Sequence, residues 1–283
     1  MNVLSLFDGI SCGQIALERA GIKYDNYFAS EIDKNAIKVT MANYPDTIQL
    51  GDVTKWENWD IPKIDLLIGG SPCQGFSFAG KQLNFKDPRS RLFFEFVNIL
   101  KTTKPKYFLF ENVPMKQWCQ DIISEHVGCE PIEINSALVS AQNRVRLYWT
   151  NIPNIKKPKD KNIYIKDILE KRVDEKYNIG HKIGVTINGK NSLNKLRLSK
   201  RTLDEKFRCL TAGGQTGTNA GATTIDIPGK ILRKPTETEC ERAQTLPDGY
   251  TNYISMGQRY KAIGNSWTVD VIAHIFEGLK GGI

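Results

Sequence analysis

The first 110 residues alternate short apolar runs with segments whose apolar residues recur at helical spacing. Short apolar runs predict buried strands, whereas a period near 3.6 residues predicts amphipathic helices. Strands and helices in alternation predict a parallel sheet with helices on both faces, which is an α/β fold. The predicted strands cover residues 2–7, 26–32, 47–53, 64–70 and 106–113, and the predicted helices cover residues 13–22, 35–44 and 91–101.

The next segment extends the sheet and then changes character. Two strand-like runs, 131–140 and 144–152, predict a hairpin joined through 141–143. Beyond Pro153 the apolar rhythm weakens, and a loop rich in glycine and threonine covers 211–224. The chain is therefore predicted to leave the main sheet at this point.

Two helices are predicted near the carboxyl terminus. The first covers 236–246, and Thr236 and Glu239 have the spacing of a capping box. The second covers 266–280, is amphipathic, and is predicted to return to the main domain.

Composition places the chain among ordinary soluble proteins. Its 283 residues are 40% hydrophobic and 25% charged, which is typical of a globular chain. No apolar run approaches the roughly 20 residues that span a bilayer, and the first residues lack the charged start and the length of a signal peptide. We therefore expect a cytoplasmic protein with no membrane partner.

The cysteines and histidines lack the spacing of metal ligands. The six cysteines are scattered without a CxxC pair, and His126, His181 and His274 stand far apart. A structural metal site needs closely spaced ligands, so we expect no metal. Reduced thiols are the default in the cytoplasm.

The formal net charge of +8 is concentrated in one segment. Residues 155–208 hold 16 lysines and arginines against 7 aspartates and glutamates, whereas the rest of the chain holds 23 against 24. A basic patch of this kind is typical of proteins that bind a phosphate backbone. A lysine-rich surface that only meets solvent has the same composition, so charge alone leaves both interpretations open.

One cysteine stands directly after a proline, in the segment GGSPCQGFS at 69–77. Gly69 and Gly70 end a predicted strand and Pro72 fixes the next backbone angle, so Cys73 is predicted to lie at the carboxyl edge of the sheet. Open α/β sheets bind ligands at that edge. Most cysteines are small buried apolar residues, and this remains the alternative to a reactive role.

Three more strand ends carry residues suited to a nucleoside. Gly9 and Gly13 flank a tight turn, where glycine lets the backbone approach a ligand closely. The turn lacks the GxGxxG spacing of dinucleotide sites. Glu31 can accept hydrogen bonds from two ribose hydroxyls, and Asp52 can accept one from an adenine amine. Together they predict a nucleoside cofactor across the strand ends, although each acid alone is also typical of an ordinary cap.

A further acid, Glu111, ends the strand after Cys73 and is predicted to face the same crevice. A thiolate can add to C6 of a pyrimidine if an acid hydrogen-bonds N3 and stabilises the developing charge. C5 then attacks a sulfonium methyl donor, and loss of the C5 proton with elimination of the thiolate restores the cysteine. A base inside a duplex is out of reach of such a site and must be flipped out.

These segments, in this order, resemble the DNA cytosine-5 methyltransferase family. The resemblance covers nearly the whole chain and includes the Pro-Cys loop, ENV at 111–113, QNRVR at 142–146 and AIGNSW at 262–267. FDGISCG and GNSW also look like the compact catalytic domains of animal de novo methyltransferases. The resemblance implies a class I S-adenosylmethionine-dependent Rossmann-like fold, with a mixed, mostly parallel sheet and a small target-recognition lobe.

The resemblance also implies roles for individual residues. Cys73 matches the nucleophile, with Pro72 shaping its turn, and Glu111 matches the acid that holds N3 and the exocyclic amine of cytosine. Arg144 and Arg146 match a pair that supports the site, although their spacing also fits a surface ion pair. Positions matching the lining of the S-adenosylmethionine site are Phe7, Asp8, Gly9, Ile10, Ser11, Cys12, Gly13, Glu31, Ile32, Asp52, Val53, Asn265, Ser266 and Trp267.

DNA contacts are expected from polar residues of the Pro-Cys loop and the segment after it (69–91), of QNRVR, and of the glycine-rich loop with the residues just before it. Arg, Gln and Asn can read purine edges in the major groove. The expected contacts are Gln74, Ser77, Arg89, Arg91, Gln142, Arg208, Thr211, Gln215, Thr216, Thr218 and Asn219.

The implied reaction is methyl transfer from S-adenosylmethionine to C5 of a flipped cytosine in a short site of double-stranded DNA. A cognate restriction endonuclease is a candidate partner, and a monomer is expected. The implied division is a catalytic cofactor-binding domain over 1–154, a small basic target-recognition region over 155–230 and a helical return over 231–283.

Three other functions compete with this one. A tRNA cytosine-5 methyltransferase would share the motifs, and a direct comparison of DNA and tRNA substrates would separate the two. A non-catalytic DNA-binding relative would typically have lost the nucleophile or the acid. A folate-dependent pyrimidine alkylating enzyme would act on free nucleotides and would not need the basic segment.

Overall fold

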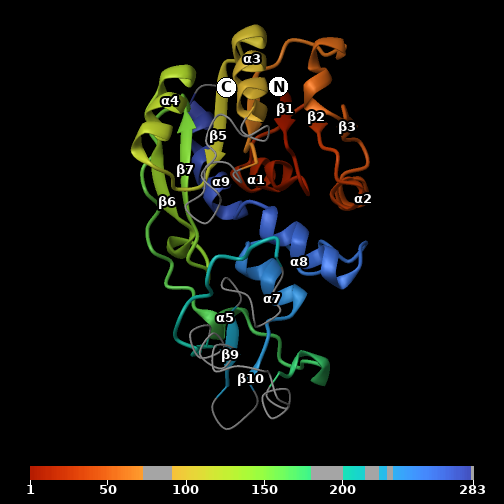
Figure 1. Cartoon of the computed structure of the whole chain (residues 1–283), viewed down its shortest axis with the longest axis vertical. Coiled ribbons are helices and arrows are strands. Elements are labelled where there is room, and N and C mark those ends of the chain that lie inside the picture. The colour runs from red at the N-terminus through yellow and green to blue at the C-terminus, as the bar shows by residue number, and fades with distance from the viewer. Residues whose placement is uncertain (73–90, 180–199, 214–222, 228–231, 282–283) are drawn as a thin grey trace. The chain divides into compact units, whose positions relative to one another are not determined.

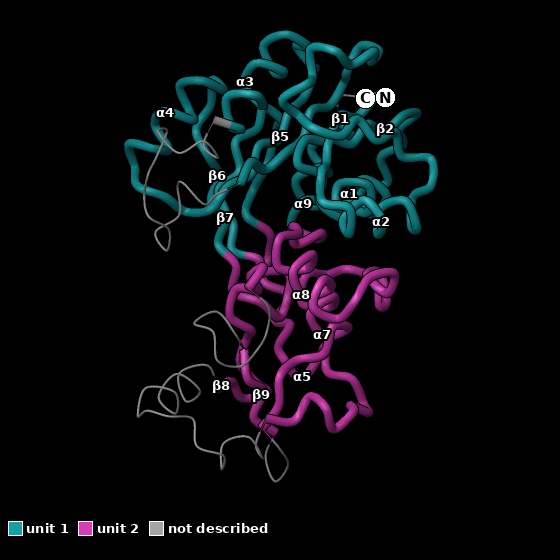
Figure 2. Tube along the Cα trace, turned by 45° about the vertical axis from the view of Figure 1, so that its right-hand side comes forward, with its two compact units in different colours: residues 1–135, 145–157, 271–283 teal, residues 136–144, 158–270 magenta. Residues whose placement is uncertain are grey.

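The chain divides into two compact units (Figure 2). Unit 1 comprises residues 1–135, 145–157 and 271–283, and unit 2 comprises residues 136–144 and 158–270. The predicted boundary after residue 154 lies close to one of these divisions, whereas the predicted helical return is shared between the units. The computed structural model describes residues 1–72, 91–179, 200–213, 223–227 and 232–281.

Unit 1 is built on a seven-stranded sheet of β1 (Asn2–Leu6), β2 (Asn26–Ser30), β3 (Ile48–Gln49), β4 (Leu66–Gly69), β5 (Tyr107–Asn112), β6 (Ile132–Asn135) and β7 (Val145–Thr150). The strands are ordered β3-β2-β1-β4-β5-β7-β6 (Figure 1). β1 to β5 run parallel, and β7 runs antiparallel between β5 and β6. The predicted mixed, mostly parallel sheet is confirmed.

Helices cover both faces of this sheet, namely α1 (Cys12–Ala20), α2 (Lys34–Asn43), η1 (Val53–Asn58), α3 (Arg91–Thr103), α4 (Gln117–Val127), α9 (Val269–Phe276) and η6 (Glu277–Gly281). α3 and α4 lie on one face, and α1 and α9 lie on the other (Figure 1). The three predicted helices of this region are confirmed, and α4 is an addition to them. No helix in the described part of the chain is both long and apolar enough to cross a membrane.

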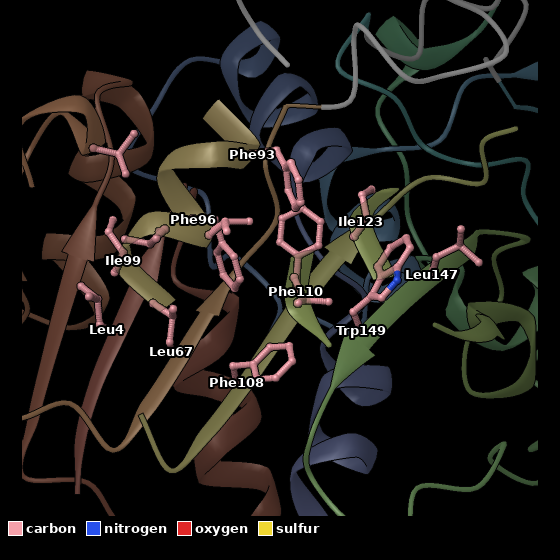
Figure 3. Packing of buried hydrophobic residues seen from close by; sticks show 14 of the residues in the cluster. Leu4, Leu67, Phe93, Phe96, Ile99, Phe108, Phe110, Ile123, Leu147 and Trp149 are labelled. Carbon is pink, nitrogen blue, oxygen red and sulfur yellow. The ribbon is translucent and has the colours of Figure 1, made fainter. Parts of the chain in front are cut away.

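Alternate strand residues form the core on the α3 side, as the period of two requires (Figure 3). Leu4, Leu67 and Phe110 come from three strands of the sheet and are fully buried. The ring of Phe110 lies 5.4 Å from that of Phe93 and 4.8 Å from that of Phe96, both of which belong to α3. This aromatic layer fixes α3 across the centre of the sheet.

Two strand predictions differ from the structure in extent. The strand predicted over 47–53 is reduced to β3, because Gly51 turns the chain at a φ of 75° and Asp52 caps η1 by accepting from the Thr54 N–H. The antiparallel pair of β6 and β7 is confirmed, but its connection is the longer segment 136–144, which contains η3 (Ser136–Leu138).

Unit 2 contains a three-stranded sheet and short helices, namely β8 (Lys200–Arg201), β9 (Thr224–Asp226), β10 (Leu232–Arg233), α5 (Ile165–Ile168), η4 (Glu175–Tyr177), α7 (Glu237–Ala243) and α8 (Met256–Asn265). β9 pairs parallel with β8 and antiparallel with β10. The predicted capping box is confirmed, since Thr236 Oγ1 accepts from the Glu239 N–H and Glu239 Oε2 accepts from the Thr236 N–H. The helix predicted over 266–280 begins at Val269 in the structure, as α9.

Buried ion pairs hold unit 2 together. Glu239 is fully buried and receives two hydrogen bonds, at 2.6 and 2.7 Å, from the guanidinium of Arg233. Glu241 is also fully buried and accepts from the Thr251 N–H at 2.9 Å and from Arg259 at 3.0 Å. Removal of one partner would leave a buried charge without its counter-charge, so the loss of either residue of a pair would strongly destabilise the fold.

A close approach in unit 2 requires glycine at position 264. An ideal Cβ at Gly264 would lie 2.3 Å from the carbonyl carbon and oxygen of Thr211 and 2.7 Å from the nitrogen of Ala212. Atoms that close must move apart, and the obstacle is backbone rather than a flexible side chain. The segment at 211–212 is therefore packed directly against the end of α8.

Gly264→Ala should lower the free energy of unfolding by about 1–3 kcal/mol, because the added methyl overpacks this contact. Gly257→Ala on the same helix is the control, since a Cβ there meets nothing within 4 Å and alanine favours a helix. Urea denaturation of both variants measures the difference. A Gly264→Ala variant as stable as the control would contradict the contact.

Candidate active site

Four strand ends carry candidate residues to one edge of the unit 1 sheet. The parallel register pairs Leu6 with both Ser30 and Gly69, and Gly69 with Phe110. The segments that follow β1, β2 and β4 therefore leave the sheet at the same edge as Glu111. In open α/β sheets ligands bind at this edge, where the strand order reverses.

The turn after β1 has an unusual backbone. Phe7 and Ser11 have φ values of 57° and Gly9 has a φ of 62°. A phenylalanine in the left-handed region is strained, and such strain concentrates at functional sites. Three contacts hold the turn: Ser11 Oγ donates to Asp8 Oδ2, Asp8 N donates to the Ser30 carbonyl at 3.1 Å, and Gly9 N donates to Glu31 Oε2 at 2.8 Å.

Glu31 is fixed entirely by backbone donors. Its Oε1 accepts from the N–H groups of Ile32 at 2.7 Å and Asp33 at 2.8 Å, while Oε2 accepts from Gly9. The carboxylate thus connects the end of β2 to the turn after β1. Ile32 beside it is 71% exposed, which makes it a large apolar side chain facing outward at this edge.

The other residues expected at the cofactor differ in exposure. Ile10, Cys12 and Val53 are buried. Asp52 is partly exposed, and its Oδ1 accepts at 2.9 Å from both the N–H and the hydroxyl of Thr54. These hydrogen bonds hold the pKa of Asp52 below its usual value.

Glu111 and Arg146 form the central ion pair of the site. Arg146 Nε lies 2.8 Å from Glu111 Oε1, and the two side chains are only 13% and 11% exposed. β5 and β7 bring them together. Glu111 lies opposite Tyr148 on the antiparallel strand β7, and Arg146, two residues before Tyr148, has its side chain on the same face of the sheet. The arrangement is a close ion pair at the carboxyl end of β5.

The segment leading to the cysteine is tied to the same strand end. The Asn112 amide donates to the hydroxyl of Ser71 at 3.5 Å, and both side chains are buried. Pro72 follows and is partly buried. Asn112 has no role among the predicted site residues, although it lies inside the ENV segment. Cys73, Gln74, Ser77 and Arg89 lie outside the described residues, and Arg91 is the first residue of α3.

Arg144 differs sharply from Arg146 in its surroundings. It belongs to unit 2, is 4% exposed, and donates to the carbonyls of Leu210 at 2.8 Å, Gly264 at 3.3 Å and Ser266 at 2.9 Å. Its planar guanidinium thus joins the segment around Leu210 to the end of α8. The spacing of the two arginines also fitted a surface ion pair, and Arg146 does form an ion pair, with Glu111.

Gln142, expected to contact DNA, is fully buried in unit 2. Its Nε2 donates to the Ala243 carbonyl at 3.1 Å and to Gln244 Oε1 at 3.0 Å, and its Oε1 accepts from the Leu210 N–H at 2.7 Å. A DNA contact would require these bonds to break. Gln244 in turn donates to the Ser266 carbonyl at 3.2 Å. Sequence reasoning assigned no role to Gln244, because its only signal is its place at the end of a predicted helix.

The remaining predicted residues also lie in unit 2. Asn265 and Thr211 are exposed, Arg208 and Trp267 are partly buried, and Ser266 is buried. Gln215, Thr216, Thr218 and Asn219 lie outside the described residues. Within the described ranges, no three His, Cys, Asp or Glu side chains come close enough to hold a metal ion.

Comparison with known proteins identifies the family. The family model described as C-5 cytosine-specific DNA methylase matches residues 1–121 and 130–281. The chain is 31% identical to the type II methyltransferase M.NlaX of Neisseria lactamica, covering 100% of this chain and 97% of that one. It is 34% identical to M1.ScrFI of Lactococcus lactis subsp. cremoris, covering 98% and 77%.

A solved structure shares the fold. The Entamoeba histolytica methyltransferase EhMeth superposes with a TM-score of 0.78 at 19% identity, over 99% of this chain and 98% of that one. The Rossmann-like fold inferred from the motifs is confirmed. Together these matches place the chain in the family of C-5 cytosine-specific DNA methylases, which are enzymes that methylate cytosine in DNA.

Proposed function

We propose that this enzyme transfers the methyl group of S-adenosylmethionine to C5 of a cytosine flipped out of double-stranded DNA, through a covalent bond between Cys73 and C6. The observation that supports this most is the ion pair of Glu111 and Arg146 at the end of β5, beside the Ser71 segment that leads to Cys73. An acid held there can hydrogen-bond N3 while the thiolate adds to C6.

The described residues fit S-adenosylmethionine as the methyl donor. Glu31 lies where an acid can bind ribose hydroxyls, and the exposed Ile32 offers an apolar surface to a base. Asp8 offers a carboxylate within the strained turn. When bound, the donor supplies a sulfonium methyl group, and C5 becomes nucleophilic enough to accept it only after the thiolate has added to C6.

Arg146 supports this chemistry through the acid. Its guanidinium fixes the orientation of the Glu111 carboxyl by a 2.8 Å contact. Negative charge that builds on the pyrimidine during addition is stabilised by donors already in position, which avoids the cost of reorienting them. Transfer of the methyl group, loss of the C5 proton and elimination of the thiolate complete the cycle.

The partner in this proposal is duplex DNA, bound by the basic residues of 155–208. Arg208 and Thr211 begin the expected recognition loop and are at least partly exposed. The curated relatives are named type II methyltransferases, and such enzymes operate in restriction-modification. A cognate endonuclease is therefore part of the proposal, as is action by a monomer.

Base-resolution cytosine-conversion sequencing tests the proposal as a whole. Mixed-sequence duplex DNA incubated with the protein and S-adenosylmethionine should acquire protected cytosines in one recurrent short context. The same incubation with Cys73→Ala should protect none, because no thiolate can add to C6. Protection by the variant would overturn the nucleophile, and protection of tRNA but not DNA would overturn the substrate.

Glu111→Gln should slow methyl transfer by about 100- to 1000-fold, because the amide keeps the shape but cannot give up a proton to N3 as a carboxylic acid can, and it loses the ion pair with Arg146. Single-turnover transfer at saturating DNA measures the step directly. Glu133→Gln, an exposed acid on β6 of the same sheet, is the control and should retain full activity. An active Glu111→Gln enzyme would remove the acid from the mechanism.

Glu31→Ala should weaken binding of S-adenosylhomocysteine by about ten-fold or more, since a hydrogen-bonded carboxylate is lost from the proposed ribose site. Calorimetric titration measures the dissociation constant. Glu57→Ala, an exposed acid on η1, is the matched control. Affinity for DNA should be preserved in both variants, and an unchanged cofactor titration for Glu31→Ala would refute the ribose role.

A further inference from the structure

The carboxylate of Asp8 is surrounded by hydroxyl groups. Tyr27 Oη donates to Asp8 Oδ1 at 2.8 Å, Ser11 Oγ donates to Oδ2, and the hydroxyl of Ser5 also hydrogen-bonds the carboxyl. The charged neighbour is the acid Glu31, so no described residue supplies a cation to Asp8. A carboxylate that is oriented by neutral donors keeps its capacity to bind a cation.

Tyr27 is built into the sheet beneath the turn. It lies on β2 with 2% of its surface exposed. α1 approaches so closely that a Cβ at Gly13 would lie 2.6 Å from Tyr27 Oη and 2.6 Å from Ile68 Cδ1. Burial and the nearby Asp8 raise the pKa of Tyr27 well above its usual value, so the hydroxyl remains a donor. Its direction is fixed by packing.

We propose that Tyr27 is a positioning residue that holds Asp8 in the orientation required to bind the α-ammonium of the methionine part of S-adenosylmethionine. This inference rests on the proposed function and assigns a role at the same site. It explains why a buried tyrosine points its hydroxyl at an acid that has no positive partner among the described residues. Burying a carboxylate without a counter-charge is costly, and a cationic ligand group removes that cost.

A pair of ligands isolates the proposed contact. S-adenosylhomocysteine carries the α-ammonium, and its deaminated analogue carries hydrogen in that position. By calorimetry, Tyr27→Phe should weaken S-adenosylhomocysteine about ten-fold but leave the analogue within about two-fold. Asp8→Asn should show the same selectivity with a larger loss, since it removes the charge itself.

Tyr24→Phe is the matched control. The two rings are neighbours, with centroids 5.7 Å apart, but the Tyr24 hydroxyl donates to Gln14 Oε1 rather than to Asp8. The same chemical change is thus made next to the site without touching the carboxylate. Both ligands should bind this variant as they bind the original protein.

The pH dependence of binding distinguishes positioning from a general loss of structure. Burial raises the pKa of Asp8 and Glu31 adds to this, while the hydroxyls of Ser11, Ser5 and Tyr27 lower it. Affinity for S-adenosylhomocysteine should fall as pH falls through this pKa, because Asp8 becomes neutral. Without the Tyr27 hydroxyl the pKa rises further, so Tyr27→Phe should lose affinity at a higher pH than the original protein or Tyr24→Phe.

The outcomes separate this inference from the proposed function. If the original protein binds S-adenosylhomocysteine and Tyr27→Phe binds it equally well, only the positioning role is overturned. Equal losses for both ligands would likewise overturn it, because the hydroxyl would then support the fold rather than the ammonium contact. If the original protein binds neither ligand, the cofactor of the proposed function is refuted as well.

Discussion

The reversal of strand order beside β1 is the constraint on which the rest of the site depends. The chain lays down β1, β2 and β3 in one direction and then places β4 and β5 on the other side of β1. Sheets of this kind bind ligands at the reversal, outside the carboxyl ends of the strands. The strained turn at Phe7, the acid at Glu31, the Pro72 segment and Glu111 all follow from that one topological choice, although they are far apart in the sequence.

The two acids of unit 1 that are proposed to bind the cofactor are satisfied in a different way from two buried acids of unit 2. In unit 2, Glu239 and Glu241 are fully buried and paired with arginines. In unit 1, Asp8 and Glu31 accept from hydroxyls and backbone N–H groups instead. Neutral donors orient a carboxylate without cancelling its charge, which leaves it able to bind hydroxyl or cationic groups of a ligand.

Periodicity predicted most of unit 1, because strands buried on both faces and amphipathic helices leave strong patterns. The third strand was predicted too long, since Gly51 and the cap at Asp52 redirect an apolar run into η1. The order of the motifs identified Glu111 and Arg146 as site residues. In the structure the two side chains form an ion pair between β5 and β7. Tyr27 and Gln244 escaped sequence reasoning because a tyrosine in a strand and a glutamine in a helix carry no local signal. Their roles arise only from what they face.

The two arginines of QNRVR show how one short motif serves two tasks. The boundary between the units falls between residues 144 and 145, so Arg144 is anchored in unit 2 and Arg146 in unit 1. Arg144 needs a planar fork, because it donates to three carbonyls at fixed positions. Arg146 needs a charge beside Glu111. Lysine could supply that charge but could not reproduce the fork, so the two positions constrain the sequence for different physical reasons.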